Sequence, residues 1–171
     1  MVYKVRVYNV GMKKIKLSNV NRYVLLDNDD YERLKKYKYW LRKDGYACHT
    51  LHRRSDHKTD IATIVCMQWE VLKQERGKYI DHINRNTLDN RKENLRVCSG
   101  SENQINRSAP KNNTSGFKGV SYHNRDKSFR AQIRFGGITY RLGTFKTARE
   151  GAIAYNKKAQ ELTPFAYLNK V

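Results

Sequence analysis

The chain has 171 residues, a length that fits one domain or two small ones. Its 35 Lys and Arg outnumber its 16 Asp and Glu, and the resulting net charge of +19 favours polyanionic partners. Aromatic residues make up 11% of the chain, which argues against disorder and favours a folded, basic nucleic-acid binder.

The basic charge is spread along the chain rather than gathered in a tail. Residues 1–107 hold 23 Lys and Arg against 13 Asp and Glu, and residues 108–171 hold 12 against 3. Both parts therefore suit one polyanion, although a generic basic protein such as a ribosomal component has a similar composition. Cys48, Cys66 and Cys98 form no Cys-x-x-Cys pair, which argues against a thiolate zinc site and favours the reduced thiols of an intracellular protein.

Strand and helix patterns alternate from the N-terminus onward. The opening MVYKVRVYNVGMKK alternates valine with polar residues and lacks a long apolar run, which predicts a strand rather than a signal peptide or a membrane span. A further strand is predicted over Tyr23–Leu26, followed by a helix that Asp27 or Asn28 caps.

A hairpin and a second helix follow. Two extended runs flank Asp44-Gly45, a favoured hairpin turn. The next β-branched run becomes a helix from about Cys66, and Gly77 is expected to end it. The helix residues expected to point into the core are Met67, Val71 and Leu72. The surface, or a position facing a phosphate, is expected for His49, His52 and His57.

An asparagine-rich segment comes next, over residues 79–107. KYIDH predicts a short strand, RNTLDNRKEN a loop with one helical turn, and LRVCS a second strand. SENQINR then opens a helix that Ser99 or Ser101 caps. The order is strand, loop, strand, helix.

Residues 108–115 have the composition of a linker, and the pattern changes beyond them. FKGVSYHN, KSFRAQIRF and ITYRLGTF predict three strands joined by turns. A helix follows, with Thr147 and Glu150 forming a capping box. Its expected buried stripe is Ala148, Ala152, Tyr155, Ala159 and Leu162.

The asparagine-rich segment has the side chains that a phosphodiester hydrolase needs. An Asn carbonyl oxygen suits a hard metal ion and adds no charge that would repel phosphate. A histidine beside it is a base of suitable pKa near neutral pH. Asp81 and His82 are adjacent at a strand end, and Asn94 and Asn103 follow at spacings of 12 and 21 residues from the histidine.

This segment resembles the active site of the HNH (ββα-metal) endonucleases, in the His-Asn-Asn variant of homing enzymes. The resemblance rests on the Asp81-His82 pair, LDNRKENLRV and the helix with ENQIN, and weaker upstream similarity begins near residue 20. It implies that His82 activates water and that Asp81 and Asn103 ligate one divalent ion, Mg²⁺ or Mn²⁺. Asn94 would brace the loop and orient His82. Weaker candidates for phosphate contacts are Arg91, Arg96 and Asn106. Family members often have a histidine where this chain has Gln68.

The C-terminal part resembles an AP2 DNA-binding domain over about residues 115–160. The resemblance rests on GV, RAQIRF, LGTF and TAREGAIAYNKKA. It implies a three-stranded sheet backed by one helix, with an exposed face that enters the major groove and has no acid to balance its charge. The residues expected to contact DNA are Lys118, His123, Arg125, Arg130, Gln132, Arg134 and Arg141.

The predicted fold class is α+β. A nuclease domain over 1–107, with its ββα-metal core at about 78–107, is joined by the linker 108–115 to an AP2-like domain over 116–171. The predicted function is a site-specific, metal-dependent DNA endonuclease that acts on double-stranded DNA, as a monomer or a dimer and without a membrane. It would be phage- or intron-encoded and work in the cytoplasm of a bacterial host. The alternatives are a DNA-binding regulator with an inactive nuclease motif and an RNA-binding protein.

Overall fold

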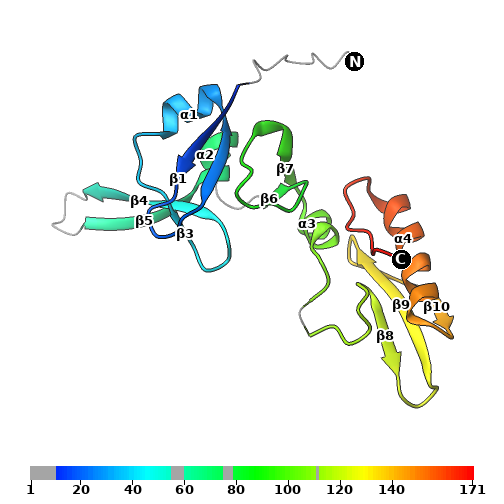
Figure 1. The fold of residues 1–171 in the computed structure, drawn as a ribbon. Helices are drawn as coiled ribbons and strands as arrows, with labels where there is room; N and C mark the ends of the chain where they lie inside the picture. Colours follow the sequence, from blue (N-terminus) through cyan, green and yellow to red (C-terminus); the bar gives the residue numbers. More distant parts are fainter. Residues whose placement is uncertain (1–10, 55–59, 75–78, 111) are drawn as a thin grey trace, which may run out of the picture. The chain divides into compact units, whose positions relative to one another are not determined.

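The fold is that of a computed structural model, which describes residues 11–54, 60–74, 79–110 and 112–171 (Figure 1). The chain divides into two compact units, Met1–Val97 and Cys98–Val171. Small antiparallel sheets and helices make up both units, which confirms the α+β class. None of the helices in the described ranges is long and apolar enough to cross a membrane.

The described residues of the first unit form three small sheets. In chain order its elements are β1 (Met12–Lys16), β2 (Tyr23–Asp27), α1 (Asn28–Leu34), β3 (Trp40–Leu41), β4 (Ala47–Arg54), β5 (Asp60–Cys66), α2 (Met67–Leu72), β6 (Tyr79–His82), the 3-10 turn η1 (Lys92–Asn94) and β7 (Leu95–Cys98). β1 pairs with β2, β4 lies between β3 and β5, and β6 pairs with β7. The predicted hairpin at Asp44-Gly45 is therefore confirmed, since β3 and β4 pair on either side of it.

Two sequence-based expectations for this unit need correction. α2 ends at Leu72 rather than at Gly77, because Lys73 adopts a left-handed conformation (φ 51°) that cannot continue the helix. His49 is buried rather than on the surface, with its ring stacked on Tyr37 at 4.2 Å between centroids. The strand predicted at the N-terminus falls mostly on residues 1–10, and these, like His57, lie outside the described residues.

One hydrophobic core holds the first unit together. Every sheet and both helices contribute apolar side chains to it, among them Leu26, Leu34, Met67 and Ile80. Leu88, in the loop between β6 and β7, is also buried there. Burial of this apolar surface is the main source of stability for the unit.

The loop between β6 and β7 is fixed against β2. Leu25 of β2 donates its N–H to the Leu88 carbonyl (2.8 Å) and accepts from the Asn90 N–H (2.9 Å). The Asp27 carboxylate also accepts from the Lys92 N–H (2.8 Å). A loop held at three backbone positions offers a rigid support for side chains around β6.

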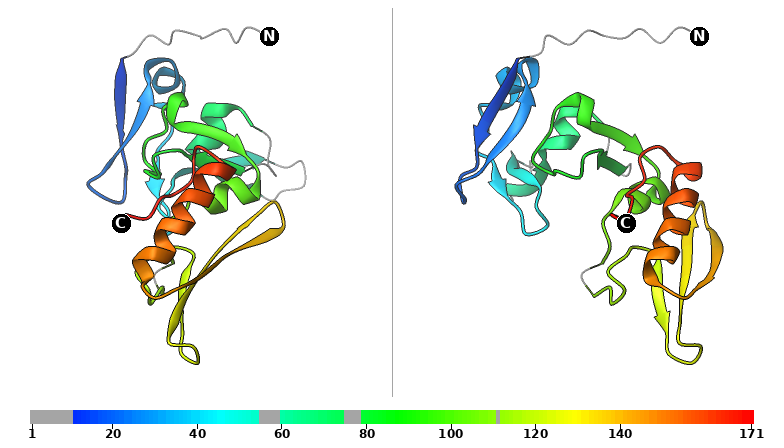
Figure 2. Two further views of the ribbon diagram at one scale, coloured as in Figure 1. Left: turned by 90° about the vertical axis from the view of Figure 1, so that its right-hand side faces the viewer. Right: turned by 45° about the vertical axis from the view of Figure 1, so that its right-hand side comes forward.

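The described part of the second unit has one sheet, one long helix and one short helix. Its elements are α3 (Gly100–Asn106), β8 (Val120–His123), β9 (Ser128–Phe135), β10 (Ile138–Phe145) and α4 (Ala148–Leu162). The strands form an antiparallel sheet in the order β10-β9-β8. α4 lies along one face of this sheet, where Ala152, Tyr155 and Ala159 are buried (Figure 2). The predicted stripe of small residues allows that close approach, and the Thr147–Glu150 capping box is present.

α3 packs within the second unit. Ile105 is buried in a core with Ile133 and Tyr155, and its carbonyl accepts from the Tyr167 N–H (3.0 Å). Ser99 caps α3 with Glu102 as the partner in a capping box, as one of the two predicted caps. The division of the chain therefore falls before α3, whereas the sequence groups α3 with the nuclease domain 1–107.

The predicted linker is partly ordered by hydrogen bonds of the second unit. Asn113 donates its backbone N–H to the Pro110 carbonyl (3.0 Å) and its side-chain amide to the Phe117 carbonyl (2.9 Å). The Ser115 hydroxyl donates to the Val120 carbonyl at the start of β8 (2.7 Å). Residues 112–115 of the linker thus build the entry to the sheet.

Candidate functional site

Asp81 and His82 end strand β6, and both side chains are buried, with 6% and 3% of each residue exposed. Strand β6 carries them because Ile80 anchors it in the core of the first unit. Buried polar side chains need partners, so their contacts define what this site can do.

His82 lies against an asparagine that the sequence pattern did not single out. Its Nε2 is 3.3 Å from Oδ1 of Asn90, which is fully buried and whose side-chain N–H₂ donates to the Thr87 carbonyl (3.3 Å). Because the amide nitrogen of Asn90 is used in that bond, its oxygen faces the imidazole and accepts from Nε2–H. The neutral ring then has its basic lone pair on Nδ1.

Burial is the largest influence on the pKa of His82 and lowers it from its ordinary value of 6.5. The hydrogen bond to Asn90 and the negative charges of Asp81 and Asp89 raise the pKa of His82 without cancelling the effect of burial. The imidazole is therefore neutral at physiological pH, which is the state that a general base requires.

Asn94 spans the loop that supports His82. Its side-chain oxygen accepts from the Asn84 N–H (2.9 Å), and its amide donates to the Asp89 carbonyl (2.7 Å). Its own carbonyl accepts from the N–H of Ile83, the residue after His82 (2.9 Å). These contacts are of the kind expected of a bracing residue, and the role in orienting His82 stays a prediction.

Asp81 is paired with an arginine on the neighbouring strand. Arg96 of β7 donates from Nε (3.0 Å) and Nη2 (2.8 Å) to Oδ2 of Asp81. The sequence placed Arg96 among the phosphate contacts, and that role stays a prediction. In the structure its guanidinium binds the carboxylate of Asp81, the predicted metal ligand. No sequence signal identifies this pair, because an Asp and an Arg fifteen residues apart meet only through the pairing of β6 with β7.

The donor types at Asp81 and Asn103 fit Mg²⁺ or Mn²⁺, because carboxylate and amide oxygens are hard ligands. Within the described residues no group of three or more His, Cys, Asp or Glu side chains is arranged to hold a metal ion. Asn103 is half-buried on α3, in the second unit. The convergence of Asn103 with Asp81 stays a prediction.

Three further residues expected to contact DNA have structural partners. Arg91 is held by Asp89, through two bonds of 2.8 and 2.7 Å, and by Glu93. Asn106 is buried, with 2% of the residue exposed. The Lys118 ammonium donates to the Ile105 carbonyl (2.7 Å) and two others at the end of α3. These environments favour roles in stability. In the case of Lys118, the ammonium group satisfies carbonyls that the C-terminal end of α3 leaves unpaired.

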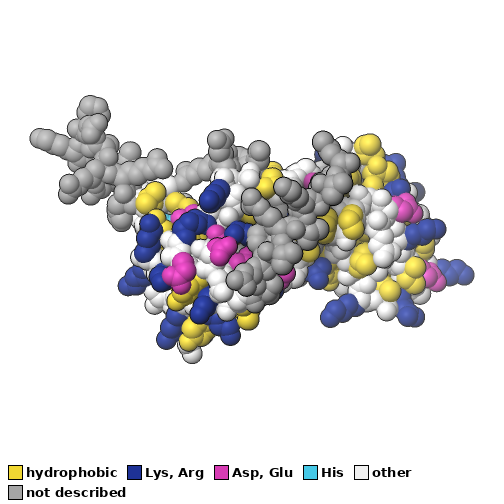
Figure 3. Space-filling model, turned by 90° about the horizontal axis from the view of Figure 1, so that it is seen from above, with side chains coloured by type: hydrophobic (Ala, Val, Ile, Leu, Met, Phe, Trp, Pro, Cys, Tyr) yellow, Lys and Arg dark blue, Asp and Glu magenta, His cyan; other side chains and the backbone are white. Residues whose placement is uncertain are grey.

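The open face of the second unit carries the remaining candidates. Arg130, Gln132 and Arg134 alternate with buried residues along β9 and are exposed, and Arg141 of β10 pairs directly with Gln132. We call this set, Arg130, Gln132, Arg134 and Arg141, the basic face. Figure 3 shows Lys and Arg side chains on the surface of both units, with fewer acids among them.

The basic face is not free of acids, contrary to the sequence-based expectation. Asp126, in the turn between β8 and β9, forms an ion pair with Arg130 and lies 3.1 Å from Nδ1 of His123. Arg125, in the same turn, is exposed. Gln132, Arg134 and Arg141 thus form the part of the face that extends away from Asp126 along the strands.

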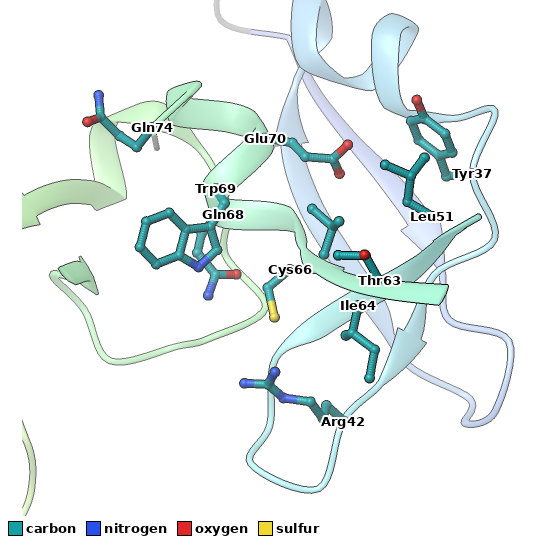
Figure 4. A pocket seen from close by; sticks show the side chains of 11 residues that line it. Tyr37, Arg42, Leu51, Thr63, Ile64, Cys66, Gln68, Trp69, Glu70 and Gln74 are labelled. Carbon is teal, nitrogen blue, oxygen red and sulfur yellow. The ribbon is translucent and has the colours of Figure 1, made fainter. Parts of the chain in front are cut away.

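A cavity of about 760 Å³ lies elsewhere in the first unit, between β5 and α2 (Figure 4). Gln68 and Trp69 of α2, Cys66 and Arg42 line it, whereas Asp81 and His82 do not. The side-chain oxygen of Gln68 is buried without a hydrogen-bond partner in the described part of the chain. The cavity is therefore separate from the hydrolytic candidates.

Comparison with known proteins shows that the segment around His82 matches a nuclease family. The family described as HNH endonuclease matches residues 73–105. An uncharacterised HNH endonuclease of Acanthamoeba polyphaga mimivirus is 30% identical over 150 residues, covering 84% of this chain and 72% of that protein. Protein 3.8 of Escherichia phage T7 is 41% identical over 58 residues, covering 34% of this chain and 48% of the phage protein. No solved structure matches the chain.

Proposed function

This chain belongs to the HNH endonuclease family, and from that membership we propose that it is a site-specific, metal-dependent DNA endonuclease of the homing type. The single observation that carries the proposal is the environment of His82. A buried, neutral imidazole with its Nε2 on Asn90 ends a strand inside the segment that the family covers.

His82 would act as the general base. With Nε2–H directed at Asn90, Nδ1 is the atom that takes the proton from the attacking water. Asn90 and Asn94 would hold the ring and its loop in place throughout the reaction, since both are buried and hydrogen-bonded. A preorganised base avoids the cost of reorientation during proton transfer.

Asp81 and Asn103 would hold the metal ion. When bound, a divalent cation supplies positive charge against the scissile phosphate and the leaving 3′ oxygen. The two protein ligands leave coordination positions for phosphate oxygens and water, which suits a nuclease better than a closed site.

The basic face would place the enzyme on duplex DNA. A twisted antiparallel sheet fits the major groove, where Arg can contact guanine and Gln can contact adenine in bidentate fashion. This part of the proposal rests on the AP2-like sequence motifs and on the exposure of Gln132, Arg134 and Arg141. A phage or intron origin accords with the viral sources of both relatives.

The test is nicking of supercoiled plasmid that carries the DNA flanking the gene, with Mg²⁺ or Mn²⁺. We expect relaxation by the intact protein and a loss of about 1,000-fold in His82→Ala, because general base catalysis contributes on that order. Gel-shift affinity of the variant for the same DNA should be unchanged. Tight binding by the wild type without cleavage in any divalent metal would instead support a regulator with an inactive nuclease motif. Preference for RNA over duplex DNA in competition would support the RNA-binding alternative.

A further inference from the structure

Asp81 and Arg96 form an ion pair inside the proposed active site. Their side chains are 8% and 13% exposed, and both bonds from the guanidinium end on the same carboxylate oxygen, Oδ2. Asp81 lies on β6 and Arg96 on β7, and these two strands are hydrogen-bonded neighbours in one sheet. The positive charge of Arg96 is therefore held beside the position at which Asp81 would bind a cation.

A guanidinium and a divalent ion cannot share this oxygen without strong repulsion. At low solvent exposure the repulsion between two positive groups is weakly screened. Removal of either partner from a buried ion pair also leaves the other charge unpaired, which is costly. Arg96 thus stabilises Asp81 while no metal is bound and opposes the arrival of the metal.

Duplex DNA offers Arg96 another partner. A phosphate oxygen carries negative charge and matches the fork of guanidinium donors as well as a carboxylate does. If Arg96 forms an ion pair with a backbone phosphate of DNA in place of Asp81, the Asp81 carboxylate becomes available to the cation. Binding of DNA and binding of metal then favour each other, and by linkage the effect is reciprocal.

We propose that Arg96 is an internal counter-ion that keeps metal affinity low until DNA is bound. This inference rests on the proposed function, since it takes Asp81 as the metal ligand. It makes Arg96 a regulator of metal loading as well as the phosphate contact that the family resemblance implies. The enzyme would then bind its metal ion once it is bound to DNA, and the enzyme without DNA would stay inactive.

The test measures Mn²⁺ binding to the intact chain by calorimetry, without DNA. Arg96→Gln should bind Mn²⁺ about tenfold more tightly than the wild type, a change within the usual range of coupling between two sites. The matched control is Arg91→Gln, which breaks the neighbouring ion pair with Asp89 at the same change of charge. Its Mn²⁺ affinity should stay within about twofold of the wild type, because general charge effects are screened. Circular dichroism checks that each variant is folded. If Arg96→Gln unfolds, Arg96→Lys, which keeps the charge, replaces it. Arg96→Lys should bind Mn²⁺ as weakly as the wild type.

The second measurement repeats the titration with duplex DNA in the His82→Ala background, where cleavage does not consume the DNA. DNA should raise Mn²⁺ affinity about tenfold with Arg96 present and by much less with Arg96→Gln. Equal or weaker Mn²⁺ binding by Arg96→Gln without DNA overturns the inference, as does failure of both proteins to bind Mn²⁺. Plasmid nicking by the wild type is scored separately, so the proposed function can stand when this inference fails.

Discussion

The two regions that bear the proposed function are built in opposite ways. Around His82 the polar side chains are buried and paired, with Asn90 fully buried and Asn94 6% exposed. On the basic face of the second unit, Gln132, Arg134 and Arg141 are exposed. Catalysis requires side chains that are fixed in position and shielded from water, whereas a surface that binds DNA must leave its hydrogen-bond donors accessible. Substitutions should therefore damage the first region through structure and the second through affinity alone.

Among the substitutions that compare the two regions, the largest effect on stability is expected at Asn94. Asn94→Ala removes one buried and one partly buried hydrogen bond, which the Asp89 carbonyl and the Asn84 N–H then lose. We expect a loss of roughly 3 kcal/mol in the free energy of unfolding, measured by urea denaturation. Plasmid nicking should fall about 100-fold under conditions where the variant is folded, because the base is misplaced.

The matched control is Asn86→Ala in the same loop, where the asparagine is exposed. Its effect on stability should stay below about 1 kcal/mol, since the Asn86 side chain is exposed and its bond from the Leu88 N–H is long (3.2 Å) and only partly buried. Equal losses at Asn86 and Asn94 would show that burial does not distinguish the two asparagines, and the contrast between regions would weaken.

The next effect concerns the basic face. Gln132→Ala combined with Arg141→Ala removes a directly paired set on β9 and β10. We expect DNA affinity to fall about 100-fold in gel shifts, because two bidentate base contacts are lost. The free energy of unfolding should change by less than about 0.5 kcal/mol, because both side chains are exposed.

A control with the same change of charge exists on the opposite side of the second unit. Lys157→Ala combined with Gln160→Ala removes two exposed side chains from α4, which covers the other face of the sheet. Its effect on affinity should not exceed about threefold, the amount expected of distant charge. If this variant binds DNA as weakly as the first, the open sheet face is not the DNA-binding surface.

A smaller effect is expected in the pH profile of cleavage. A general base works when neutral, so the rate rises as pH increases through the pKa of His82, which burial lowers below 6.5. Asn90→Asp places a carboxylate beside the imidazole, favours the protonated ring and raises that pKa. The acid limb of the rate profile should move to higher pH by about one unit. A limb that stays in place or moves to lower pH would argue against the contact between Asn90 and His82 in the active enzyme.

The smallest effect is expected at Asp126. Asp126→Asn releases Arg130 from its ion pair and removes a negative charge near the basic face. We expect duplex DNA affinity to rise about threefold at low salt and the gain to shrink as salt increases. Weaker binding by the variant would mean that Asp126 positions Arg130 for DNA rather than competing for it.

Local sequence patterns predicted most of the elements. Helix α3 begins directly after Ser99 and α4 directly after Thr147, because each has a capping box encoded within four residues. The alternation in β9 placed Ala131 and Ile133 on the buried side and Arg130, Gln132 and Arg134 on the exposed side. The end of α2 was missed because a left-handed Lys73 has no reliable sequence signal.

The sequence by itself determined which chemical groups this protein has and in what order they come, because caps, alternation and the Asp81-His82 motif are local properties. Only the tertiary structure decided their partners. Asn90 meets His82 through a loop anchored on β2, Arg96 meets Asp81 across two strands, and α3 packs in the second unit. Such contacts join residues that are distant in the chain, and the free energy that selects them comes from packing of the whole unit, which a local pattern does not encode.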